Sequence, residues 1–258
     1  MSNSIEDKLR KMIGGKKVVL IGPSDYINKE LDDKHGEYVD SYDVVIRLNN
    51  MIHMEDKDLE KKYYGTKYDI IASAFWHHNN MGSHIDQWEH KRFLVEDSYE
   101  KLKEGTILYE CYARDLFIEI YHKFKSTINK RHLVYGNSSA NFYRKTLQLL
   151  NQIHPIDRTP TTGMVMMGMI LLMNPRKLYV SGITCYLDTK HNAYFDGYFI
   201  SNYVEKKSGY FDGKTFDYSK EKAQHHPYQS EQKILAWLIN NKKIKVDKYL
   251  KKLVKNVN

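Results

Sequence analysis

The feature that most constrains the fold is a run near residue 160 in which a polar loop, an apolar helix and an apolar strand follow one another. Met164 to Met173 is almost wholly apolar, which predicts a helix that is buried on most of its faces. Thr159, Thr161 and Thr162 precede it, and a threonine hydroxyl can cap a helix by accepting a bond from a backbone N–H. An Asn-Pro pair ends the helix. The run from Leu178 to Ile183 then predicts a short central strand.

Further short apolar runs predict more strands, and most of them alternate with segments of helical pattern. The strands are expected within residues 16–22, 44–48, 64–73, 106–112 and 133–136, and the helices within 5–13, 84–104, 115–128, 140–152 and 230–239. Strands that alternate with helices indicate an α/β fold with a mainly parallel sheet and helices on both faces. The length of 258 residues suits a single domain. We place its core at about residues 16–240.

Two loops of this predicted fold are suited to a phosphate or a nucleotide. A glycine-containing loop that opens a buried helix, here Pro160–Gly163, presents free N–H groups and the positive end of the helix dipole to an anion. The alternative is that this loop only caps a core helix. Gly22 follows the first strand, where α/β folds place nucleotide-binding loops. A G-x-G-x-x-G fingerprint is absent, so a standard dinucleotide site is not supported.

The charge is concentrated at the end of the chain. Residues 242–258 hold seven lysines against Asp247, and they therefore carry most of the net charge of +8. Apolar residues recur there at helical spacing, which predicts a basic amphipathic C-terminal helix that docks on the body of the protein. The alternative is a helix that binds a membrane surface or a partner. The nearly neutral body argues against nucleic acid as a partner.

Other features narrow the class of protein. Two cysteines, Cys111 and Cys185, do not form a disulfide framework, and they are expected to be small buried hydrophobes. Metal-type Cys/His spacing is absent, and so are a signal peptide and a membrane-spanning run, which predicts a soluble, cytoplasmic protein. Residues 187–228 are rich in Tyr, Asp, Gly, Lys and His, and we expect an active-site loop or lid there.

Three stretches, in this order, resemble the motifs of the animal-type sialyltransferases, glycosyltransferase family 29. Residues 18–22 and 40–49 resemble the start and end of the family's large motif. Pro160-Thr-Thr-Gly163, with the apolar helix and residues 178–182, resembles the small motif. His226-Pro-Tyr-Gln-Ser-Glu231 matches the very small motif, in which His and Glu are separated by four residues. The resemblance spans about residues 16–235.

This resemblance implies a Rossmann-like fold of the GT-A-like sialyltransferase type and an inverting, metal-independent transfer. Sialic acid would pass from CMP-sialic acid, a substrate rather than a cofactor, to a hydroxyl of a glycan or glycolipid. His226 corresponds to the catalytic base, and Glu231 is expected to orient its ring or to cap the helix that follows. The residues expected at the nucleotide and its phosphate are Gly22, Ser24, Asn49, Thr161, Thr162, Gly163 and Tyr210.

The chain also departs from the family pattern. Pro23 stands where the family usually has Asn, and the best match to the third motif, Gly209–Asp212, lacks its leading His. Two alternatives therefore stay open: a transferase for another CMP-activated acidic sugar such as CMP-Kdo, and a non-catalytic nucleotide-binding relative. For an enzyme of either kind, removal of residues 242–258 is expected to leave the CMP site intact.

Overall fold

A seven-stranded parallel sheet forms the centre of the protein. The computed structural model describes residues 4–48, 57–73, 102–112, 132–188, 190–191 and 226–257. The strands are β1 (Lys17–Ile21), β2 (Val44–Leu48), β3 (Ile70–Ser73), β4 (Ile107–Glu110), β5 (Val134–Asn137), β6 (Lys177–Ser181) and β7 (Lys245–Val246). They follow the order β5-β4-β3-β2-β1-β6-β7, and every neighbouring pair is parallel. The predicted α/β sheet is confirmed.

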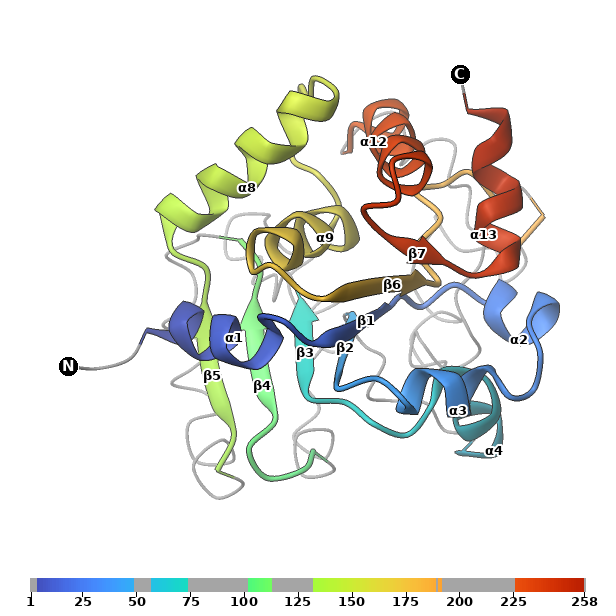
Figure 1. Cartoon of the computed structure of the whole chain (residues 1–258), viewed down its shortest axis with the longest axis horizontal. Helices are drawn as coiled ribbons and strands as arrows, with labels where there is room; N and C mark the ends of the chain where they lie inside the picture. Colours follow the sequence, from blue (N-terminus) through green and yellow to red (C-terminus); the bar gives the residue numbers. More distant parts are fainter. Residues whose placement is uncertain are drawn as a thin grey trace, which may run out of the picture.

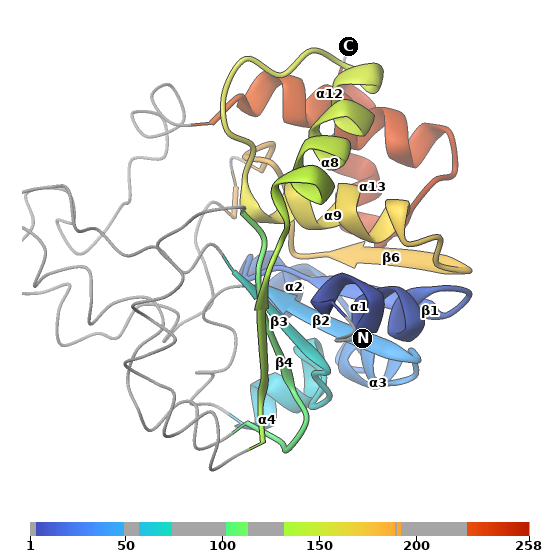
Figure 2. The same cartoon turned by 90° about the vertical axis from the view of Figure 1, so that its left-hand side faces the viewer.

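Helices cover both faces of this open sheet. They are α1 (Ile5–Ile13), α2 (Tyr26–Glu30), α3 (His35–Asp40), α4 (Lys57–Leu59), the π-turn η1 (Glu60–Tyr64), α8 (Ala140–Ile153), α9 (Thr162–Leu172), α12 (Tyr228–Asn240), α13 (Lys248–Leu253) and the 3₁₀ turn η3 (Val254–Asn256). Figures 1 and 2 show α8, α9 and α12 on one side of the sheet and α3 and α4 on the other. The architecture is Rossmann-like. Among the described residues, no helix is long and apolar enough to cross a membrane.

Three predictions fall on residues that are not described. They are the helix at 84–104, of which only residues 102–104 are described and are not helical, the helix at 115–128 and most of the loop or lid at 187–228.

The order in which strands are added to the sheet reverses direction at β1. After β1 the chain adds β2 to β5 on one side, and it then returns to add β6 and β7 on the other side of β1. In open α/β sheets a ligand binds outside the carboxyl ends of the strands at such a switch point. Here this point lies between β1 and β6. Helix α9 leads directly into β6, and its residues Gly163 to Ile170 are all buried.

The prediction of one continuous helix over residues 242–258 is wrong. Lys245–Val246 instead forms the edge strand β7, which takes its backbone partners from β6, and α13 begins only after Asp247. The Asp247 side chain caps α13 by accepting a bond from Leu250 N (2.7 Å), and it also accepts bonds from the hydroxyls of Tyr26 and Ser181, each at 2.7 Å. The apolar residues of this segment pack inward, with Leu250 and Val254 buried, which confirms that it docks on the body.

Candidate functional site

Two glycines bring the loops after β1 and β6 into backbone contact. Gly22 follows β1, and its N–H donates to Ser181 O at 2.8 Å. A Cβ on Gly22 would lie 2.2 Å from Gly182 O, and a Cβ on Gly182 would lie 2.3 Å from Gly22 O. Gly182 also has φ +73°, in the left-handed region that favours glycine. Both positions therefore require glycine for the two loops to meet.

The same contact extends to the first turn of α9. Ile183 lies between the two elements, because a Cβ on Gly22 would be 2.5 Å from its Cγ1 and a Cβ on Gly163 would be 2.9 Å from its Cγ2. Ser24 lies beside them, with its N–H donating to Gly182 O at 3.3 Å. The Ser24 hydroxyl is buried and has no hydrogen-bond partner in the described part of the chain. The predicted nucleotide residues Gly22, Ser24 and Gly163 are thus close neighbours.

The amino end of α9 presents two backbone donors. Thr161 is its N-cap, and the Thr161 hydroxyl accepts a bond from Met164 N at 3.4 Å. The N–H groups of Thr162 and Gly163 have no acceptor among the described residues. Such orphan N–H groups, with the positive end of the helix dipole, form a site for an anion.

Glu231 closes one side of this helix end. It lies on the first turn of α12 and is fully buried. The Thr161 N–H donates to its Oε1, and the Thr161 hydroxyl donates to its Oε2 at 3.1 Å. Burial raises the pKa of the Glu231 carboxyl to about 7, although the two bonds from Thr161 act in the opposite direction. The described hydrogen bonds of the Glu231 carboxyl therefore go to Thr161, the cap of α9. They do not go to the His226 ring or to the backbone N–H groups at the start of α12.

His226 lies just before α12 and contacts the loop that precedes α9. Its Nδ1 lies 2.9 Å from Thr159 O. A carbonyl oxygen can only accept, so Nδ1 carries the proton, and in the neutral ring Nε2 is then the basic nitrogen. This is the tautomer that a general base with Nε2 as its reactive atom requires.

Seven of the nine predicted site residues lie in the described part of the chain. Five of them are joined by direct contacts or by sequence adjacency: His226, Glu231, Thr161, Thr162 and Gly163. The other two, Gly22 and Ser24, contact the loop after β6, which in turn contacts Gly163. Asn49 and Tyr210 lie outside the described residues. Gly182 and Ile183 belong to the site but were predicted only as part of a strand. The signal for Gly182 was a glycine directly after a buried strand, the same signal that singled out Gly22.

In the described part of the chain, no group of three or more His, Cys, Asp or Glu side chains is arranged to hold a metal ion. No protein-family model matches the chain, and no match to a curated protein is found. The fold and the site together define an open, parallel, Rossmann-like α/β protein. Its candidate anion site lies at the switch point between β1 and β6.

Proposed function

We propose that this protein transfers sialic acid from CMP-sialic acid to a glycan hydroxyl with inversion at the anomeric carbon. One observation carries the proposal: the segments that resemble the small and very small motifs are in direct contact. Thr161 is bonded to Glu231 across 70 residues of sequence, and Thr159 is bonded to His226 across 67. The two segments are far apart in the sequence, and their resemblance to the motifs rests on short strings alone. The contact supports a common role for the two segments.

The amino end of α9 would hold the phosphate of the donor. The N–H groups of Thr162 and Gly163 and the dipole of α9 would stabilise the negative charge that grows on CMP as it leaves. Gly22 and Gly182 hold the loops after β1 and β6 against each other beside this helix end. The nucleotide would then lie over the switch point, beside Ser24.

His226 would act on the acceptor. As the acceptor oxygen bonds to the anomeric carbon, the bond from that carbon to the phosphate oxygen breaks, and the hydroxyl proton passes to Nε2 of His226. The bond from Nδ1 to Thr159 O keeps the proton off Nε2 before the reaction. Attack opposite to the departing CMP inverts the anomeric carbon.

Calorimetric titration with CMP, followed by assays of donor hydrolysis and transfer, tests the proposal. The proteins are the wild type, His226→Ala and the control His154→Ala, which changes a histidine at the end of α8 whose Nδ1 also lies near a carbonyl oxygen. We expect similar CMP affinities for all three. Loss of a general base should lower turnover by about 10²–10⁴-fold in His226→Ala alone.

Each other outcome has a definite meaning. Folded wild-type protein that does not bind CMP would overturn the proposal. CMP binding without hydrolysis or transfer would favour a non-catalytic nucleotide-binding relative. Turnover of CMP-Kdo, but not of CMP-sialic acid, would correct the donor sugar and keep the proposed chemistry.

A further inference from the structure

The end of the sheet opposite to the candidate site is crowded with cations. Strands β1, β6 and β7 are neighbours, and Lys17 pairs in register with Lys177, as Tyr179 does with Lys245. Adjacent strands lie about 4.8 Å apart, so the residues that enter these strands are close together. We define the amino-end basic surface as Lys16, Lys17, Arg176, Lys177, Lys242, Lys243 and Lys245.

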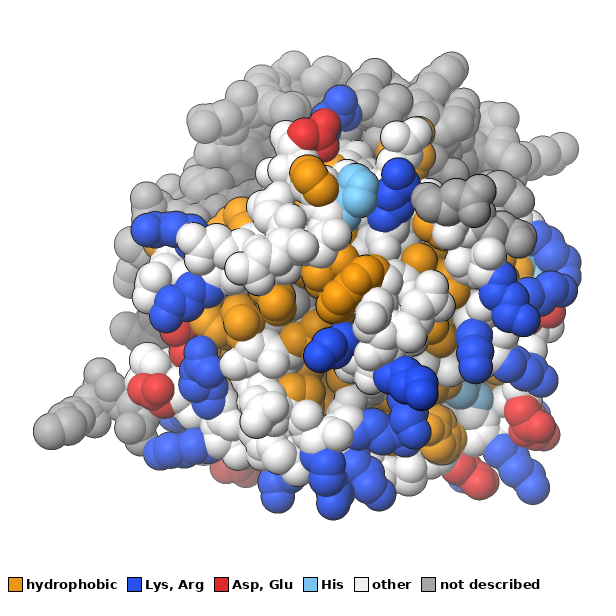
Figure 3. Space-filling model, turned by 45° about the horizontal axis from the view of Figure 1, so that its top comes forward, with side chains coloured by type: hydrophobic (Ala, Val, Ile, Leu, Met, Phe, Trp, Pro, Cys, Tyr) orange, Lys and Arg blue, Asp and Glu red, His pale blue; other side chains and the backbone are white. Residues whose placement is uncertain are grey.

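Most of these charges are not compensated. Arg176 lies 3.8 Å from Asp43, and the Lys177 ammonium donates to the Tyr38 hydroxyl at 3.1 Å. The ammonium groups of Lys16, Lys17, Lys242, Lys243 and Lys245 have no hydrogen bond or ion pair within 4 Å to any described residue. The exposed Asp43 carboxylate accepts a bond from the Lys17 N–H, and this bond together with the nearby charges of Arg176, Lys16 and Lys17 lowers its pKa, so Asp43 offsets one of these charges. Figure 3 shows Lys and Arg side chains spread over this side of the molecule with few Asp or Glu among them. Unpaired like charges at this density favour an anionic partner.

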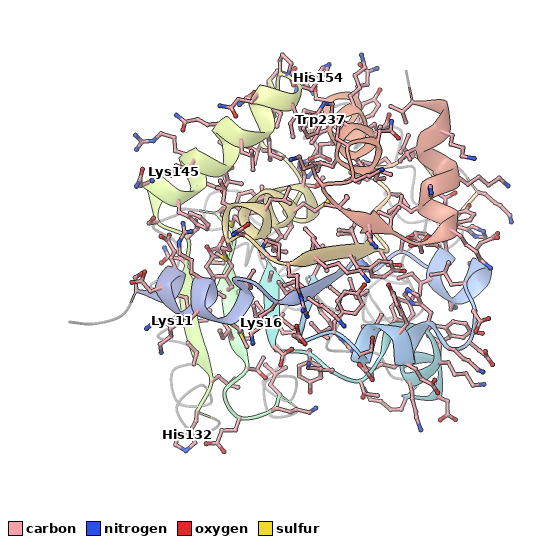
Figure 4. All side chains as sticks on the ribbon, in the orientation of Figure 1. Lys11, Lys16, His132, Lys145, His154 and Trp237 are labelled. Carbon is pink, nitrogen blue, oxygen red and sulfur yellow. The ribbon has the colours of Figure 1, made fainter. Side chains whose placement is uncertain are left out.

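One exposed aromatic side chain, Tyr38, contacts the amino-end basic surface, and a second, Trp237, lies on α12. Tyr38 and Trp237 are the exposed large hydrophobic residues of the described chain, at 42% and 40%. Tyr38 contacts Lys177, and Trp237 lies near the end of α12, just before Lys242. Figure 4 labels Trp237 on α12 and Lys16 near the amino end of β1. An amphipathic ring beside a lysine, as at Tyr38 and Lys177, favours the boundary between lipid headgroups and acyl chains.

We propose that the amino-end basic surface binds an anionic phospholipid bilayer. The lysines stand on turns that enter three separate strands, so they cover a blunt end of the sheet. They do not follow one helix or ribbon of the kind that enters a DNA groove. The apolar stripe of residues 246–257 packs on the core, so the contact uses the lysines rather than that stripe. The candidate site, at the opposite end, stays turned toward water.

Cosedimentation with vesicles tests this proposal independently of the proposed function. The full-length protein is mixed with vesicles of phosphatidylcholine alone or with added phosphatidylserine, at low and high salt. We expect binding to the anionic vesicles only, and weaker binding as salt rises. The triple variant Lys16→Ser, Lys243→Ser, Lys245→Ser should lose on the order of a hundredfold in vesicle affinity. Trp237→Ser should weaken binding further.

A matched control removes the same charge elsewhere. This control is a second triple variant, in which three exposed lysines of η1 and α8 are replaced: Lys61→Ser, Lys62→Ser, Lys145→Ser. It should lose less vesicle affinity than the first triple variant. All the changed lysines are exposed, so both variants should unfold at the wild-type temperature. Equal losses in the two variants would overturn the proposal, as would equal binding to neutral and anionic vesicles. Binding of an RNA or DNA oligonucleotide without binding of vesicles would also overturn it.

Discussion

Glu231 is a carboxyl group at the amino end of a helix, in a place that water does not reach. Two effects oppose each other there. Burial favours the neutral acid, whereas the bonds from Thr161 and the dipole of α9 favour the carboxylate. The pKa of about 7 shows that burial is the larger effect. The charge at the proposed phosphate site therefore changes near neutral pH.

This pKa predicts the sign of a stability change with pH. Between pH 4.5, the usual pKa, and pH 7 the folded protein holds a proton on Glu231 that the unfolded chain has released. The free energy of unfolding therefore falls as the pH rises through this window, by about 3 kcal/mol from this group. Glu231→Gln, which keeps the shape and removes the charge, should abolish this contribution. Urea unfolding at several pH values between 4 and 8 measures it.

The exposed residue Glu37 on α3 provides the control for this experiment, because Glu37→Gln makes the same chemical change at a surface position. Relative to the wild type, Glu231→Gln should gain stability steadily as the pH rises. Parallel profiles for the wild type and Glu231→Gln would show that folding does not change the pKa of Glu231.

At the scale of elements, the close approach of the loops after β1 and β6 fixes the candidate site. Gly182→Ala should destabilise the protein by about 4 kcal/mol, because it adds a clash with Gly22 O to the strain of a left-handed backbone. Gly105→Ala separates the two effects. Gly105 has φ +80° with nothing within 4 Å of a Cβ, so its substitution should cost about 1 kcal/mol from strain alone.

Chemical denaturation gives both values, and titration with CMP gives the effect on the site. Gly182→Ala should weaken CMP binding, whereas Gly105→Ala should not. Equal losses in the free energy of unfolding of the two variants would show that the two loops can move apart without loss of stability. The site would then not depend on their contact.

The helices and strands could be predicted from the sequence better than the contacts between them. Each helix or strand depends mainly on the pattern of its own residues, whereas the contacts depend on residues far apart in the chain. The strand expected at 16–22 is β1 at 17–21, and the apolar run that follows the α9 helix is β6, because apolar runs ended by glycine define buried strands. The partners of Glu231 and His226 lie 67 to 70 residues away and are set by how α9 and α12 pack. No local pattern encodes them. Asn49 and Tyr210 remain predictions.

The error at the carboxyl end of the chain has the same origin. A helical stripe was present in the sequence, but Asp247 is held by Tyr26, 221 residues away, and by Ser181, 66 residues away. Those bonds place the helix start after β7. The periodic stripe correctly predicted which side chains are buried, since burial depends on the face that a residue occupies. It did not predict where the helix begins.

On the scale of the whole molecule, residues 242–258 form part of the core rather than an appendage. Ile244, Leu250 and Val254 are buried, and their removal from water is worth about 6 kcal/mol. This value is comparable with the total stability of a typical domain, about 5–15 kcal/mol. The expectation from the sequence that removal of residues 242–258 leaves the CMP site intact is therefore replaced, because these residues are part of the core. Their deletion should abolish cooperative unfolding and, with it, the CMP site. Thermal unfolding and size-exclusion chromatography measure the outcome.

Point variants test the same prediction in proteins that still fold, through the free energy of unfolding that each one loses. Leu250→Ala should lower the free energy of unfolding by about 3 kcal/mol through the cavity that it leaves. Lys251→Ala, at the exposed neighbouring position, should change it by less than about 0.5 kcal/mol. A deletion variant that unfolds cooperatively at the wild-type temperature would show that the first six strands are stable alone. In that case residues 242–258 would not be needed for the fold, and Lys242, Lys243 and Lys245 would contribute only to the amino-end basic surface.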